Sequence, residues 1–186
     1  MIKEVIFFGR KHIKDITPVL GVEKYATLSI CDPDKEHPEY PDWINSKYKI
    51  SFSDVKEHQM HIRDKVWKHR ADIIYPSDTD IVKVLFWLNG VHEHPNTFIL
   101  YISSEHGLHR AASFARFLSA IDPNIKVSSP VYVSTDWHNR LLSGQIAKVY
   151  RVVHDELKYR KAQATYYGHA RNTEQTLRGK ADNSTV

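Results

Sequence analysis

The spacing of hydrophobic residues changes near the middle of the chain and predicts a strand, a loop and a helix in direct succession. Residues 98–102 form an uninterrupted apolar run rich in β-branched and aromatic side chains, which predicts a strand covered on both faces. From Arg110 to Ile121 the apolar residues recur at helical spacing, which predicts an amphipathic helix. The polar segment between them, residues 103–109, is therefore a tight loop.

Other apolar segments predict further strands that alternate with helices. Strands are expected at residues 1–8, 25–31 and 48–52, and a short apolar segment, 127–133, follows the central helix. Residues 10–21 connect the first two strands and contain a possible helical turn before Pro18. Alternation of strands with helices indicates an α/β fold, with a central, mostly parallel sheet flanked by helices.

Two more helices are expected outside the central segment. Ser77 is a good N-cap with Asp80 three residues later, and the stripe that follows ends at Asn89-Gly90. Residues 137–157 form a longer helical pattern. Its inward-facing positions are expected to be Leu141, Leu142, Ile146, Val149, Val152, Val153 and Leu157. Two prolines and the lack of hydrophobic periodicity predict a surface loop at residues 35–42. The secondary structure of residues 56–75 is ambiguous from the sequence.

Composition places the chain among ordinary globular proteins. Its 186 residues, of which 41% are hydrophobic and 26% charged, predict a single domain at 1–168 with a polar tail at 169–186. No apolar stretch approaches the roughly 20 residues of a membrane span, so we expect a cytoplasmic protein without a membrane partner. Its one cysteine, Cys31, excludes an internal disulfide. The net charge is +4, but the sequence contains no nucleic-acid-binding motif, so nucleic acid is not an expected partner.

The loop at residues 103–109 has features that favour anion binding. It contains Gly107, and Arg110 stands where the helix begins. Backbone N–H groups of such a loop and of a helix N-terminus can converge on one anion. Arginine adds a planar pair of donors that matches two phosphate oxygens.

The run Ser103–Ala111 resembles the phosphate-binding loop of the protein tyrosine and dual-specificity phosphatases. That signature is His-Cys, five residues including a glycine, Arg, and then Ser or Thr. The resemblance implies a phosphatase-like fold and a set of phosphate-binding residues in this chain. These are Ser104, Glu105, His106, Gly107, Leu108, His109 and Arg110.

Weaker similarity to small bacterial and phage members of that family lies on both sides of the loop. Residues 49–55 resemble the strand and acidic turn before the family's loop, which implies that Asp54 is the general acid. Residues 137–142 resemble the segment that opens the family's last helix. Asp78 and Asp80 are alternative acids, although their place at a helix start favours capping.

Three positions depart from the family pattern. Ser104 occupies the place of the nucleophilic cysteine, Ser103 that of the preceding histidine, and Ala111 that of the hydroxyl residue after the arginine. A serine cannot be ionised by the loop as a thiolate can, and it needs an adjacent base to act as a nucleophile. We therefore expect a pseudophosphatase that binds a phosphorylated ligand at Ser104–Arg110 without hydrolysing it, although its status as an enzyme stays open.

Three alternatives remain at this point. In the first alternative the chain is an active phosphatase whose cysteine was replaced by Ser104 to trap substrate. In the second it is a phage-type protein that sequesters a phosphorylated nucleotide signal. In the third alternative the loop is a vestigial turn in which Arg110 pairs with Glu105 or Asp54.

The expected partner is a phosphorylated small molecule, nucleotide or phosphoprotein. No cofactor is expected. A metal site is not expected either, because His92 with His94, and His58 with His61, lack an obvious third ligand.

Overall fold

A computed structural model of the chain describes residues 1–54, 75–96, 98–105, 109–130, 139–156 and 158. Its centre is one five-stranded sheet in the order β3-β2-β4-β1-β5, and all of the strand pairs are parallel. The strands are β1 (Ile2–Gly9), β2 (Lys24–Cys31), β3 (Ser46–Ser51), β4 (Phe98–Ser104) and β5 (Lys126–Ser128). The parallel sheet with its helices confirms the expected α/β class.

The hydrophobic pattern of each strand matches its place in the sheet. β4 is buried at all seven positions and lies between β1 and β2, which explains its continuous apolar run. β3 lies at an edge, and its side chains alternate between more and less exposed positions. Lys47 and Lys49 on β3 are exposed, and charged side chains of this kind discourage pairing with another chain.

The helices at residues 78–93 and 110–121 begin as the sequence predicts, but the first of them ends later. A complete capping box of Ser77 and Asp80 starts α2 (Asp78–Glu93), and α3 spans Arg110–Ile121. Asn89-Gly90 does not end α2, which continues for three more residues. Val91 lies in this extension and is only 6% exposed, so its burial helps to offset the cost of a glycine within the helix.

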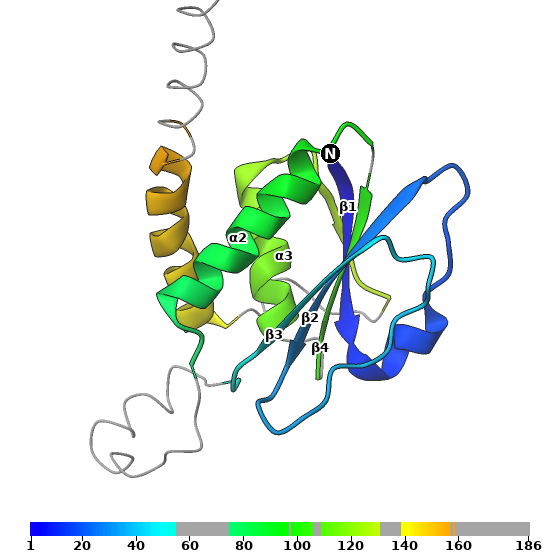
Figure 1. Cartoon of the computed structure of the whole chain (residues 1–186), viewed down its shortest axis with the longest axis horizontal. Coiled ribbons are helices and arrows are strands. Elements are labelled where there is room, and N and C mark those ends of the chain that lie inside the picture. The colour runs from blue at the N-terminus through cyan, green and yellow to red at the C-terminus, as the bar shows by residue number, and fades with distance from the viewer. Residues whose placement is uncertain (55–74, 97, 106–108, 131–138, 157, 159–186) are drawn as a thin grey trace, which may run out of the picture. The chain divides into compact units, whose positions relative to one another are not determined.

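The two faces of the sheet carry different coverings (Figure 1). Helices α2 and α3 lie on one face, and the 3₁₀ helix η1 (Arg10–Asp15) lies on the other. A cluster of buried residues fills the η1 face: Phe8, Ile13, Tyr25, Tyr40, Ile44, Ile99 and Tyr101. Tyr40 is 8% exposed, so the expectation that residues 35–42 form a surface loop is wrong at this position. Its ring belongs to the core, and prolines on either side do not reveal that.

The chain divides into two compact units, 1–149 and 150–186. In the first unit, residues 140–149 form a helix that begins directly after Asn139. In the second unit, residues 150–156 and 158 are helical, and Val152 is 69% exposed, so its expected inward position is wrong. Within the described residues, no helix is both long and apolar enough to span a membrane.

Candidate functional site

The carboxyl ends of β1 and β4 form the point of the sheet where ligand sites of α/β proteins commonly lie. Gly9 is paired with Ser104 at the ends of these neighbouring strands. The chain leaves β1 toward η1 on one face and leaves β4 toward α3 on the other face (Figure 1). Adjacent strands whose connections diverge in this way leave a crevice at the sheet's edge. The predicted anion loop therefore begins at this edge.

Arg110 is the first residue of α3, and its side chain is almost completely buried. The guanidinium is 3% exposed, and its Nη1 donates to Asp32 Oδ1 at 2.8 Å and to the backbone oxygen of Phe52 at 2.5 Å. Its Cζ lies 5.8 Å from the centre of the Phe52 ring. These contacts fix the orientation of the guanidinium, because they come from two different strand ends.

One edge of this guanidinium is not used by these contacts. Both hydrogen bonds involve Nη1, and the buried Nε has no hydrogen-bond partner among the described residues. Nε and Nη2 together form a planar pair of donors that can hold two oxygens of one anion. At the same place, the N-cap residue of α3, His109, makes no side-chain capping bond. The backbone N–H groups of the first turn of α3, at the positive end of the helix dipole, therefore lie beside Arg110.

Asn139 joins the loop's helix to the acidic turn after β3. Its Nδ2 donates to Asp54 Oδ1 at 3.1 Å, while its Oδ1 accepts from the backbone N–H of Leu142 at 3.1 Å. The Asn139 backbone N–H donates to Ser113 Oγ at 2.9 Å, and this hydroxyl donates to the His109 oxygen at 2.8 Å. Asp54 is therefore tied to α3 through Asn139, whose side chain contacts Asp54 and whose backbone N–H contacts Ser113.

The remaining side chains of the β4 end are held by different elements. Ser103 Oγ is hydrogen-bonded to the hydroxyl of Tyr40, and Ser104 is 3% exposed as the last residue of β4. Glu105 lies 3.7 Å from the guanidinium of Arg10, and its backbone oxygen accepts from the Arg10 N–H at 3.3 Å. The Arg10 backbone bond extends the pairing of β1 and β4 by one residue beyond Gly9 and Ser104.

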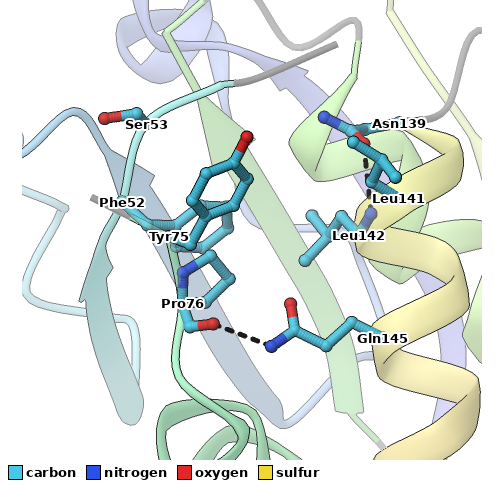
Figure 2. Close-up of a pocket in the computed structure, with 8 residues that line it drawn as sticks. All are labelled: Phe52, Ser53, Tyr75, Pro76, Asn139, Leu141, Leu142 and Gln145. Atoms are coloured by element: carbon cyan, nitrogen blue, oxygen red, sulfur yellow. Dashed lines mark hydrogen bonds between the residues drawn. The ribbon is translucent and has the colours of Figure 1, made fainter. Parts of the chain in front are cut away.

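A small cavity lies next to these residues (Figure 2). It has a volume of about 180 Å³ and is lined by Phe52, Ser53, Tyr75, Pro76, Asn139, Leu141, Leu142 and Gln145. Phe52 contacts Arg110 and Asn139 contacts Asp54, so two residues that line the cavity also contact residues predicted for the anion site. Gln145 Nε2 donates to the Pro76 oxygen at 2.7 Å and joins the two sides of the cavity.

Comparisons with protein-family models, with characterised proteins and with solved structures give no match to this chain.

The structure describes some of the residues expected to bind phosphate. Ser104, Glu105, His109 and Arg110 lie at the junction of β4 and α3, whereas residues 106–108 fall outside the described residues. The ion pair of Arg110 is formed with Asp32 and not with the considered partners, Glu105 or Asp54.

Sequence reasoning missed Asp32 and Asn139. The available signal for Asp32 was its position directly after the second strand, because acidic side chains at carboxyl ends of parallel strands meet at one edge. Asn139 carried a weaker signal as a capping residue before a helical pattern.

Other expected functional residues lie apart from this site or serve structural roles. Asp80 completes the capping box of α2, and Asp78 accepts from Gln145 and Lys148. Among the described residues, no group of three or more His, Cys, Asp or Glu side chains is arranged to hold a metal ion. The His94 ring packs edge-to-face on Phe98, and His58 and His61 fall outside the described residues.

Proposed function

We propose that this protein binds the phosphate group of a phosphorylated ligand at the junction of β4 and α3, in the loop Ser104–Arg110, and does not hydrolyse it. The observation that carries the proposal is the buried Arg110 guanidinium, which is oriented through Nη1 and keeps its Nε without a partner among the described residues. A buried donor without an acceptor is costly, and an anion oxygen at Nε would remove this cost.

Orientation of Arg110 before binding favours affinity. Binding of an anion by a mobile arginine loses side-chain entropy, whereas Asp32 and the Phe52 oxygen already hold this side chain in one geometry. The first turn of α3 adds backbone donors and the positive end of the helix dipole, since its N-cap side chain makes no capping bond. These contributions select a compact oxyanion such as phosphate over a neutral ligand.

Three residues support binding without turnover. The hydroxyl of Ser104 stands where the resembled family has a thiolate, and serine is not ionised at neutral pH without a base. Ser103 is hydrogen-bonded to Tyr40, and Ala111 is fully buried and has no hydroxyl to assist a leaving group. The groups that favour phosphate recognition are therefore present, while those that favour phosphoryl transfer are replaced.

The binding step is tested by titration calorimetry of the full chain with inorganic phosphate. Arg110→Lys keeps the charge but loses the planar donor pair, so we expect at least about a 10-fold loss of affinity, equivalent to about 1.4 kcal/mol. Arg116→Lys is the matched control, because it makes the same change on an exposed position of α3. Equal phosphate affinity in the two variants would refute the assigned site.

The catalytic step is tested separately with p-nitrophenyl phosphate. The wild-type chain is expected to release no nitrophenolate above background, and Ser104→Cys is expected to remain close to it because Ser103 and Ala111 are unchanged. Strong activity of the Ser104→Cys variant would instead support the alternative of an active phosphatase with a substituted nucleophile. Comparison of phenyl phosphate with adenosine monophosphate as ligands then separates an aryl from a nucleotide preference.

A further inference from the structure

A second group of reactive side chains lies at the carboxyl ends of β2 and β3, on the η1 face. Ser29 and Cys31 of β2 face the same side as Ser51 of β3, because Cys31 and Ser51 are paired in register. His37, from the connection after β2, lies between the strands. Its Nδ1 is 2.9 Å from Ser29 Oγ, and its Nε2 is 3.0 Å from Ser51 Oγ.

One set of hydrogen-bond directions satisfies every contact in this group. Cys31 Sγ lies 3.7 Å from the backbone oxygen of Glu36, and a carbonyl can only accept, so the thiol donates there. The Cys31 sulfur, 3.9 Å from Ser29 Oγ, then accepts from Ser29. Burial raises the pKa of the Cys31 thiol, which keeps its proton in place at neutral pH.

The tautomer of His37 with its proton on Nδ1 is the one that satisfies all of these contacts together. In this tautomer the Nδ1–H group donates to Ser29 Oγ. Nε2 is then the acceptor, and the Ser51 hydroxyl donates to it. This is the arrangement of a nucleophile, a general base and an orienting group.

The exposure of Ser51 and the charge state of His37 suit these two residues to chemistry. Ser51 is exposed, whereas Ser29 is 1% exposed, so only the outer hydroxyl can meet a ligand. Burial, with the nearby positive charges of Lys49 and Arg10, lowers the pKa of His37 and keeps the ring neutral. The same cations favour a negative charge that develops on a bound carbonyl oxygen.

We propose that Ser51 is the nucleophile and His37 the general base of an acyl-transfer site that accepts a carboxylic ester. Ser51 Oγ forms a bond to the carbonyl carbon while its proton moves to His37 Nε2 and the π electrons move to the carbonyl oxygen. When these electrons return, the bond from carbon to the alkoxy oxygen breaks, and the alcohol leaves with the proton from His37. Water then repeats the sequence on the acyl-serine and releases the acid, which regenerates the Ser51 hydroxyl.

The test is covalent labelling of the full chain by an alkyl fluorophosphonate, followed by intact mass and peptide mapping. Ser51 Oγ forms a bond to phosphorus, the phosphorus–fluorine bond breaks, and fluoride leaves as the proton passes to His37. We expect one label per chain, on Ser51, and none in Ser51→Ala. His37→Gln is expected to slow labelling at least about 100-fold.

Two comparisons keep the result specific. Ser46→Ala removes another β3 hydroxyl, one that accepts from Trp87 Nε1, and should leave the labelling rate unchanged. Thermal melting and phosphate titration of Ser51→Ala should match the wild-type chain, since the substitution keeps Asp32 and the Phe52 backbone oxygen, which hold Arg110. Labelling at another residue, absence of labelling, or an equal rate in His37→Gln would overturn the proposal.

Discussion

Substitution of Asp32 by asparagine separates two consequences of the Arg110 ion pair. The asparagine side chain would keep an oxygen acceptor for Arg110 Nη1, at the position where Asp32 Oδ1 lies 2.8 Å away. The guanidinium therefore keeps its orientation but loses its negative partner. We expect the folded state to become less stable and the affinity for phosphate to increase.

The magnitude follows from the burial of the two partners. Removal of one partner of a fully buried ion pair costs about 3–5 kcal/mol. The Asp32 carboxylate is 30% exposed while Arg110 is 3% exposed, and asparagine keeps one hydrogen bond, so about 2 kcal/mol is expected here. For binding, loss of one negative charge several ångströms from the anion removes about 1 kcal/mol of repulsion, or roughly a 5-fold change in affinity.

The assay is urea unfolding of the wild-type and Asp32→Asn chains with and without inorganic phosphate. Phosphate should recover more of the lost stability in the variant, because a tighter ligand stabilises the folded state by mass action. Asp15→Asn, which removes a carboxylate from its pair with His12 on η1 instead, is the comparison for a general loss of negative charge. If Asp32→Asn binds phosphate as weakly as the wild type or more weakly, the anion does not lie beside Arg110.

Three further predictions concern stability. Leu100→Ala in β4, where the side chain is 0% exposed, should cost about 2–5 kcal/mol in urea unfolding, whereas Leu20→Ala, at 102% exposure, should change the free energy of unfolding by less than about 0.5 kcal/mol. Ser77→Ala removes the acceptor for the Asp80 N–H in the capping box and should cost about 1 kcal/mol in the same assay; an unchanged value would contradict the role of the cap. Burial raises the pKa of Tyr101 to about 12, so the contribution of its neutral hydroxyl to the stability of the folded state is complete below about pH 10 and is lost as the pH rises toward 12. In alkaline titrations followed by circular dichroism, Tyr101→Phe should lack this loss of stability.

The sequence predicts those parts of the fold that depend on neighbouring residues. The β4 run, the Ser77 cap and the amphipathic α3 all produce the expected elements, because each signal lies within a few residues of its effect. The predicted end of α2 was wrong, since Val91 packs in the core beyond Asn89-Gly90. Periodicity reports which residues are apolar, but not whether a distant surface will cover them.

For the candidate site, the sequence predicts Arg110 and its loop but does not predict the partners of Arg110. Asp32 is 78 residues away, and its role depends on the placement of β2 beside β4 in the sheet. Likewise, His37 meets Ser51 only because β2 and β3 are neighbours in parallel register.

By itself, the sequence determined a parallel α/β sheet and an arginine at a helix start, because local periodicity and capping are properties of short segments. Only the tertiary structure decided the strand order β3-β2-β4-β1-β5, and with it which side chains meet at the carboxyl edge. Strand order is set by the packing of both sheet faces at once. The ion pair of Arg110 with Asp32 and the contact of His37 with Ser51 are consequences of that packing.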